Sequence, residues 1–395
     1  MILPGATLGV VGGGQLGRMF AIAAQRMGYR VAVLDPDPDS PAKCLADVHL
    51  EADYADPSAL DELARLCAAV TVEFENVPAE SLERLARSRP VRPGSAAIAI
   101  AQDRIREKRF ITECGLSCVP FSVVRNRDEL FTALARFESS AVLKRARFGY
   151  DGKGQARVDS LEEALLAFKE FGSEPCVLEK LLVLQSEISV ILARDAAGAT
   201  AVYPAIENRH RDGILDISLI PARAPQAITH AARDAAVRIA AALDYCGVLA
   251  VEFFISNDKL LVNEIAPRPH NSGHVTLDAC MTSQFEQQVR ALCGLPLGDP
   301  GLLCPAAMTN LLGDLWNCGV PHWEVVLEEP RAKLHLYGKR AARPGRKMGH
   351  FTCLGDSLDE ASARALRIQE SLVRELKGAG PATVSATPQS VQRGP

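Results

Sequence analysis

Apolar strands, a glycine-rich turn and an amphipathic helix alternate over the N-terminal quarter of the chain, and this alternation restricts the fold more than any other feature. Apolar runs at Leu8–Val11 and Arg30–Leu34 enclose a helical pattern at Leu16–Met27, and further strand-like runs follow at Val48–Leu50 and Ala69–Phe74. Units of this kind build parallel sheets with helices packed on the faces. The sequence therefore predicts that the chain begins with an α/β domain.

The pattern changes after a turn at Arg92–Gly94 and predicts an α+β organisation. Helices are expected at Gln102–Cys114, Leu161–Phe171, Ile228–Leu243 and Leu358–Leu376, and strands at Phe121–Val124, Ala141–Lys144, Cys176–Glu179, Glu187–Ala193, Gly247–Ile255 and Leu260–Ile265. The end of the chain has too few apolar residues to fold. The expected parts are an α/β domain over 1–100, an α+β domain over 101–304 with a small lid subdomain at about 120–183, a small C-terminal domain over 305–376 and a disordered tail over 377–395.

Composition excludes several classes of protein. Hydrophobic residues make up 48% of the 395, enough to bury a large core. The formal net charge of -4 gives no global basic field, so we expect no nucleic-acid partner. Apolar runs are far shorter than the roughly 20 residues of a membrane helix. No membrane contact and no signal peptide are expected, which makes the cytoplasm the expected location. The 11 cysteines lack the paired spacing of zinc sites and are expected to be reduced.

A glycine motif, Gly12–Gly17, follows the first strand and opens the first helix, with the G-x-G-x-x-G spacing of a dinucleotide site. Asp35 ends the next strand, where a ribose ligand would lie. Glycines at a helix N-terminus let backbone N–H groups approach an anion. That anion could be a dinucleotide or one phosphate of a mononucleotide substrate, or the glycines could serve only to turn the chain. We favour the mononucleotide, because more specific nucleotide chemistry lies elsewhere in the sequence.

Two segments offer groups that suit a nucleotide. Lys144 ends an apolar strand and is followed by the glycine-rich loop Gly149–Gln155, which contains Lys153 and can fold over phosphates. Further on, the apolar strand that reaches Glu179 and Lys180 could offer its backbone to an adenine edge, with a carboxylate for the ribose hydroxyls. A turn without a ligand and a surface ion pair are the alternatives for these two segments.

Two glutamates that interrupt apolar strands are the most specific feature. Glu252 lies in Leu249–Phe254, and Glu264 follows Asn263 in a second strand. A buried carboxylate is costly unless it is paired or binds a metal. On neighbouring strands these oxygens would suit magnesium ions that bridge nucleotide phosphates, and two buried salt bridges are the alternative.

Two polar segments near these acids suit anions. The run Arg268–His274 places several donors together, as an anionic carboxylate or acyl phosphate requires, although a solvated loop is the alternative. Five lysines and arginines and one histidine crowd into Tyr337–His350, which is most easily tolerated if an anion lies among them. We interpret this turn as a substrate phosphate site, with a solvated basic turn as the alternative.

Four ordered motifs together resemble the family of N5-carboxyaminoimidazole ribonucleotide synthetases of purine biosynthesis, which belong to the ATP-grasp superfamily. The motifs are 12–19, 148–155, 263–274 and 343–350, and the resemblance runs from about Ala6 to Leu376. It implies an ATP-grasp fold with an N-terminal Rossmann-like (pre-ATP-grasp) domain and a small C-terminal domain, and a homodimer. The implied reaction joins 5-aminoimidazole ribonucleotide and bicarbonate at the expense of ATP, with Mg²⁺ as cofactor, and gives ADP and phosphate.

The resemblance also implies a role for particular residues, carried over by position. ATP would contact Arg104, Lys144, Gly149, Tyr150, Asp151, Gly152, Lys153, Gly154, Gln155, Glu179, Lys180, Leu181, Leu182, Glu187, His210, Asn263 and Glu264. Magnesium would bind Glu252 and Glu264. The aminoimidazole nucleotide would contact Gln15, Leu16, Glu75, Tyr150, Asp151, Lys339 and Arg346. The catalytic group would comprise Tyr150, Asp151, Lys153, Arg268, His270, Asn271, His274 and Lys339.

Bicarbonate is a poor electrophile, so the implied mechanism activates it with ATP as carboxyphosphate. That species, or the carbon dioxide it releases, then meets the amine, with Asp151 as the candidate proton acceptor. Other ATP-grasp enzymes, such as a formate-dependent ribonucleotide transformylase or a biotin carboxylase, would share this chemistry with another acceptor. A nicotinamide-dependent dehydrogenase built on Gly12–Gly17 and a non-catalytic nucleotide-binding regulator are the alternatives from other classes.

Overall fold

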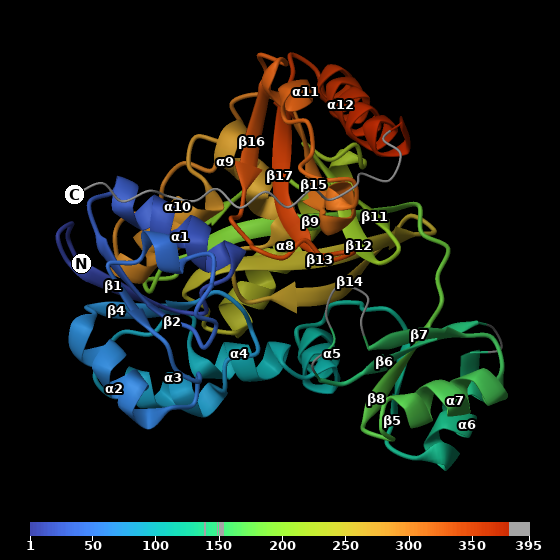
Figure 1. Cartoon of the computed structure of the whole chain (residues 1–395). Helices are drawn as coiled ribbons and strands as arrows, with labels where there is room; N and C mark the ends of the chain where they lie inside the picture. The colour runs from blue at the N-terminus through green and yellow to red at the C-terminus, as the bar shows by residue number, and fades with distance from the viewer. Residues whose placement is uncertain (138–139, 148, 150–153, 379–395) are drawn as a thin grey trace.

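The computed structural model describes residues 1–137, 140–147, 149 and 154–378. Its strands form three sheets (Figure 1). From residue 379 onward, the predicted tail lies outside the described residues, whereas residues 377 and 378 belong to the last helix, α12 (Leu358–Gly378). Among the helices described, none is both long and apolar enough to cross a membrane.

The first sheet is parallel, as the alternation predicted. Its order is β3-β2-β1-β4. The strands are β1 (Thr7–Val11), β2 (Arg30–Leu34), β3 (Val48–Leu50) and β4 (Ala69–Val72), and the helices are α1 (Gln15–Arg26), α2 (Pro57–Leu66), α3 (Ala79–Ala86) and α4 (Ser95–Ala101), with a short 3-10 turn at Lys43–Leu45. Separate apolar clusters cover its two faces. Asp56 begins α2 by accepting hydrogen bonds from Ser58 and Ala59.

The second sheet is a small antiparallel one, in the order β5-β8-β6-β7. It comprises β5 (Phe121–Val124), β6 (Ala141–Arg145), β7 (Gln155–Val158) and β8 (Cys176–Lys180), with helices α6 (Arg127–Phe137) and α7 (Leu161–Glu170). Leu143 and Leu178 pack in the core beneath these helices. Because side chains alternate along a strand, the neighbouring Lys144 and Glu179 point to the opposite face of this sheet.

The third sheet has nine strands, in the order β14-β13-β9-β11-β12-β15-β17-β16 with β10 paired to β9. The strands are β9 (Ser186–Arg194), β10 (Thr200–Val202), β11 (Ile206–Arg211), β12 (Ile214–Ile220), β13 (Gly247–Ser256), β14 (Lys259–Ala266), β15 (Ala306–Leu312), β16 (Ala332–Leu336) and β17 (Lys347–Leu354). Strands β12 and β15 pair across the expected boundary near residue 304, so one sheet runs through both parts. The domain boundaries themselves stay predictions.

One face of the large sheet is covered by helix α8 (Gln226–Ala242), and the other face carries a second apolar cluster beside polar groups. The remaining helices are α5 (Arg104–Glu113), α9 (Thr276–Ala279), α10 (Gln284–Cys293), α11 (Glu324–Leu327) and the 3-10 helices η2 (Asn271–Val275) and η3 (Gly313–Trp316). Apolar residues of α8 cover one face of β9 and β13. The other face carries η2 and the glutamates of interest. Helix α10 packs on both α1 and the large sheet, and so joins the first domain to the second.

A substitution of Phe285 on α10 tests the contact between the first domain and the second. The Phe285 ring is fully buried against Met19 of α1 and Tyr337 of the C-terminal part. We expect Phe285→Ala to lower the free energy of unfolding by about 3–5 kcal/mol, since it leaves a cavity among three segments. Phe131→Ala is the matched control, because Phe131 on α6 is 60% exposed and should cost less than about 1 kcal/mol. Urea denaturation followed by fluorescence measures both, and equal losses would contradict the assignment.

Candidate active site

Three charged residues meet where the small sheet faces helix α5. The carboxylate of Glu179 lies 2.7 Å from Nζ of Lys144 and 2.8 Å from Nζ of Lys108. Burial by itself raises the pKa of Glu179, but the two ammonium groups outweigh it and lower the pKa to about 2. Glu179 is therefore charged at neutral pH. Its carboxylate lies between the two lysines, and the contact with ATP that is expected for this strand, through its backbone, stays a prediction.

Helix α5 contributes three charged side chains, those of Arg104, Glu107 and Lys108. They lie at positions i, i+3 and i+4, which share one face of a helix. Arg104 Nη1 lies 3.1 Å from Glu264, Glu107 accepts a 2.6 Å hydrogen bond from the backbone N–H of Ile265, and Lys108 contacts Glu179. Burial is the main cause that raises the pKa of Glu107 to about 8. Of these three residues, only Arg104 was predicted from the sequence, although the spacing on a predicted helix could have identified the other two.

The two predicted metal ligands are direct cross-strand partners on β13 and β14. Glu252 lies 3.2 Å from Nε2 of His270, and burial, followed by the charge of Glu264, raises the pKa of Glu252 to about 7. The neighbouring Oδ1 of Asn263 is buried and has no hydrogen-bond partner among the described residues. Crowded carboxylates and an unsatisfied amide oxygen are hard oxygen donors, so the residues fit a magnesium ion. Each glutamate also has a cationic or imidazole partner, as the salt-bridge alternative required.

The donor-rich run after β14 is held in place by Gln284 of α10. The amide oxygen of Gln284 accepts the backbone N–H of His270, so its nitrogen faces Nδ1 of His274 at 3.1 Å. This hydrogen bond leaves the proton of neutral His274 on Nε2. Burial and nearby cations, beginning with Lys347, keep the pKa of His274 well below its ordinary value. Gln284 was not identified from the sequence.

Three atoms of this run are buried without a hydrogen-bond partner in the described parts of the chain. They are Nδ2 and Oδ1 of Asn271 and Nε2 of His274. A buried polar atom without a partner costs about 1–3 kcal/mol. Such a cluster is therefore expected to bind a polar ligand, as predicted for the bicarbonate-derived group.

A chain of buried hydrogen bonds fixes the same run to the large sheet. Ser272 Oγ lies 2.7 Å from Ser189 Oγ, and Ser189 Oγ accepts a 2.9 Å hydrogen bond from Asn208. Beside it, Nδ1 of His210 lies 2.9 Å from Glu187. Burial lowers the pKa of His210, but Glu187 outweighs it and the net shift is upward. Glu187 and His210 are thus adjacent, as expected for two nucleotide contacts.

Predicted nucleotide contacts also lie in the loops of the small sheet. The backbone N–H of Arg145 donates to the carbonyl of Gly154, which has a left-handed φ of +71° that suits glycine, and Gln155 pairs with Lys144 across β6 and β7. Gly149 lies beside Gly154. The other expected contacts are Lys180, which ends β8, and Leu181 and Leu182, which follow it. Tyr150, Asp151, Gly152 and Lys153 lie outside the described residues.

The expected substrate contacts gather between the first and third parts of the chain. Glu75 forms an ion pair with Arg268, and the amine of Lys339 donates to the side-chain oxygen of Gln15 at 2.5 Å. Burial raises the pKa of Glu75, but Arg268 outweighs it and the net shift is downward. Leu16 packs against the Phe285 cluster. In the basic turn, Arg346 donates to the carbonyl of Ala341.

The glycine motif binds carboxylates of the protein itself. Gly17 N–H donates to Glu73 at 2.6 Å, and Gly13 N–H donates to Asp35 at 2.6 Å. A Cβ on Gly14 would lie 2.2 Å from a Glu73 oxygen, which explains why glycine is required there. Burial is the main cause that raises the pKa of Glu73 to about 7. In this structure the anion at the start of α1 is thus Glu73, a residue that the motif did not reveal.

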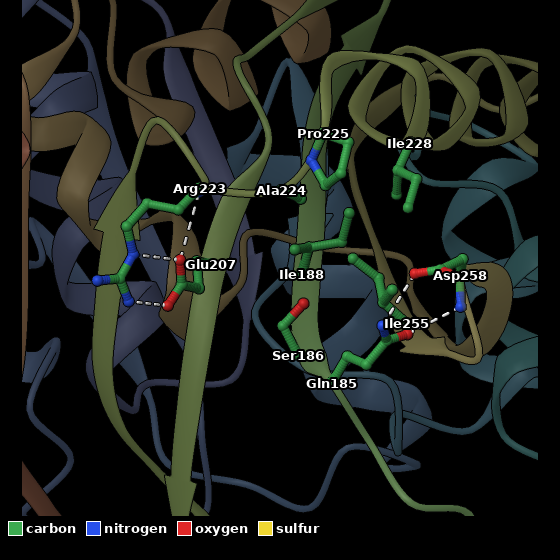
Figure 2. Close-up of a pocket in the computed structure, with 10 residues that line it drawn as sticks. All are labelled: Gln185, Ser186, Ile188, Glu207, Arg223, Ala224, Pro225, Ile228, Ile255 and Asp258. Carbon is green, nitrogen blue, oxygen red and sulfur yellow. Dashed lines mark hydrogen bonds and ion pairs between the residues drawn. The ribbon is translucent and has the colours of Figure 1, made fainter.

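A histidine cluster and a cavity lie outside the candidate active site. Asp278, His335 and His350 each bring a possible ligand atom within 4.8 Å of the others. However, the rings of His335 and His350 are stacked 4.5 Å apart with 16° between their planes, so their in-plane lone pairs do not converge on one ion. A cavity of about 310 Å³ (Figure 2) is lined by Ile188 and by the Glu207–Arg223 ion pair. It lies on the face of β9 opposite Glu187 and Glu252.

Comparisons with known proteins agree with this fold. Three family models match in order: a ribonucleotide synthetase preATP-grasp domain over 5–102, an ATP-grasp domain over 109–285 and a phosphoribosylaminoimidazole carboxylase C-terminal domain over 306–364. The chain is 46% identical to an N5-carboxyaminoimidazole ribonucleotide synthase of Brucella melitensis, over 88% of this chain and 96% of that protein.

Two solved structures are similar over nearly the whole chain. An ADP complex of an N5-carboxyaminoimidazole ribonucleotide synthetase has a TM-score of 0.88 at 41% identity and covers 95% of this chain and 99% of that one. The Aspergillus clavatus synthase in complex with ADP and 5-aminoimidazole ribonucleotide has a TM-score of 0.86 at 31% identity, with coverage of 93% and 99%.

The fold and the site define an ATP-grasp ligase preceded by a ribonucleotide synthetase domain. More particularly, the chain belongs to the N5-carboxyaminoimidazole ribonucleotide synthase family.

The ion pairs of Glu179 predict an acid-dependent stability. A depressed pKa contributes stability that is complete above the ordinary value near 4.5 and is lost as pH falls toward about 2. We therefore expect Glu179→Gln to lower the thermal midpoint at pH 7 and 5.5, and the difference from wild type to shrink below about pH 4.5. Glu62→Gln is the control, since its exposed pair with Arg65 should contribute little at any pH. A difference that stayed constant down to pH 3 would contradict this assignment.

Proposed function

We propose that this chain carboxylates 5-aminoimidazole ribonucleotide with bicarbonate and ATP, giving N5-carboxyaminoimidazole ribonucleotide, ADP and phosphate. The family relationship supports the reaction class, and the relative from Aspergillus clavatus binds ADP and the same ribonucleotide. The observation that carries the proposal is the cluster of unsatisfied buried atoms at Asn271 and His274, placed on the same sheet face as Glu252 and Glu264. Groups suited to bind an activated carboxyl group are thus found on the same sheet face as residues suited to nucleotide phosphates.

The proposed reaction has two steps. A bicarbonate oxygen first attacks the γ-phosphorus of ATP, so that the bond to the β-phosphate oxygen breaks and carboxyphosphate and ADP form. The amine of the ribonucleotide then attacks the carboxyl carbon, phosphate leaves, and the amine loses a proton. Lys144 and Arg104 are placed to neutralise the charge of the phosphates, since both are cations directed at the site. Asp151 remains the predicted proton acceptor.

Neutral His274 and the amide of Asn271 can hold the carboxyl group through donors that need no rearrangement. Nε2–H of His274 and Nδ2 of Asn271 lack other partners among the described residues, so their desolvation is compensated only when a ligand accepts from them. Arg268 is oriented by its ion pair with Glu75, which is one of the predicted ribonucleotide contacts. In this proposal, these residues therefore position the carboxyl group and stabilise negative charge as it develops.

ATP-grasp enzymes use Mg²⁺, and Glu252, Glu264 and the side-chain oxygen of Asn263 are the residues that would hold it here. The ion would supply Lewis-acid stabilisation of the phosphate oxygens. Arg104, which pairs with Glu264 in this structure, would balance any carboxylate charge that the ion leaves. We also propose bicarbonate as the second substrate and a homodimer, as the resemblance implied, and a cytoplasmic location, as the sequence itself predicted.

A dependence assay tests the reaction. Phosphate release from ATP should require both bicarbonate and 5-aminoimidazole ribonucleotide, and should not occur with formate and glycinamide ribonucleotide. Glu264→Gln should lower this release by on the order of a hundredfold, since a metal ligand is lost. Glu328→Gln, at an exposed position outside the site, should match wild type. Wild-type turnover by Glu264→Gln would contradict the metal assignment, and release without the ribonucleotide would contradict the reaction.

A further inference from the structure

We propose that Lys108 is a positioning residue that neutralises Glu179 and thereby leaves the charge of Lys144 available to the nucleotide phosphates. The inference rests on the proposed function, because it assumes that phosphates bind near Lys144. Lys108 itself is fully buried and cannot contact a ligand. Its effect on the nucleotide must therefore pass through Glu179, the acid to which its Nζ lies 2.8 Å away.

The arrangement of the three groups motivates the proposal. Each oxygen of Glu179 lies close to one ammonium group, Oε1 at 2.8 Å from Lys108 and Oε2 at 2.7 Å from Lys144. Two cations and one anion leave a net charge of +1 in a nearly dry site. Burying a lysine is costly, and one lysine would be enough to compensate one carboxylate. The second lysine is not needed to pair Glu179, and it gives these three residues an excess positive charge.

That charge is exposed to the site only through Lys144. The side chain of Lys144 is 11% exposed, whereas those of Lys108 and Glu179 are 0% and 3% exposed. Without Lys108, Lys144 and Glu179 would form a neutral ion pair at the place where anionic phosphates are expected. Electrostatic attraction is strong where water is excluded, so the loss of one unit charge there should weaken phosphate binding.

A purely structural role is the competing explanation. Lys108 belongs to α5, whereas Glu179 and Lys144 belong to the small sheet, so the contact also ties that sheet to the rest of the domain. The Lys108 ammonium lies 5.8 Å from the centre of the Phe121 ring as well. If Lys108 only anchors the small sheet, loss of its ion pair should weaken ADP binding by the same amount whatever net charge remains on Lys144 and residue 179.

Substitutions that vary charge and anchor separately distinguish the two roles. Lys108→Met removes both the anchor and the positive charge, and leaves the triad with a net charge of zero. The double variant Lys108→Met/Glu179→Gln also lacks the anchor but restores the net charge of +1. With Mg²⁺ present, we expect Lys108→Met to weaken ADP binding about tenfold in calorimetry, and the double variant to recover most of that loss.

Adenosine, which lacks phosphates, provides an internal control. Its affinity, measured by competition, should be the same in wild type and Lys108→Met, because the proposed effect acts on phosphate charge. Lys169→Met, an exposed lysine change on α7, controls for loss of a cation elsewhere on the small-sheet part. Thermal midpoints of all variants show whether each one is folded at the temperature of the measurement.

Each outcome decides one question. If Lys108→Met binds ADP like wild type, if it loses adenosine affinity equally, or if the double variant binds ADP no better than Lys108→Met, the charge role is wrong. If Lys108→Met does not fold, the double variant alone still tests the proposal, because it should bind ADP within about threefold of wild type. Failure of wild type itself to bind ADP would instead contradict the proposed function.

Discussion

The compensation of buried charge is the constraint on which the rest of this structure depends. The space between the small sheet and the large sheet holds Glu179, Glu252 and Glu264, and each carboxylate needs a cation or donor once water is excluded. Glu179 forms ion pairs with two lysines, Glu264 pairs with Arg104, and His270 lies beside Glu252. Glu252 remains incompletely compensated, as its raised pKa shows, and that deficit makes the acid pair suited to a divalent cation.

Helix α5 links these charges into one system. Its face carries Arg104, Glu107 and Lys108, which contact β14 and β8 from a single rigid element. The run after β14 is fixed in a comparable way by Gln284 and by the serine hydrogen bonds beneath it. Separate parts of the structure therefore hold in place the groups proposed to bind phosphate and the groups proposed to bind the carboxyl group.

The glycine motif correctly predicted backbone donors at a helix N-terminus, but it did not identify the anion that they bind. Gly12–Gly17 does present backbone donors to an anion at a helix N-terminus, as the spacing predicted. The anion found there is the carboxylate of Glu73, which is distant in sequence and carries no motif of its own. A dinucleotide would have to displace it. The family relationship agrees with the ATP-grasp interpretation that the later motifs favoured.

Sequence alone determined the parallel first sheet, the main helices and strands of the middle part and the identity of the paired acids, because periodicity and runs of apolar residues depend only on nearby positions. It also carried the family resemblance, through four motifs in order. Tertiary structure decided what those residues contact. That Lys108 shares Glu179 with Lys144, that Gln284 sets the proton of His274 and that strands β15–β17 extend the large sheet all depend on segments far apart in the chain. Such contacts are fixed by packing between elements, and local patterns do not encode them.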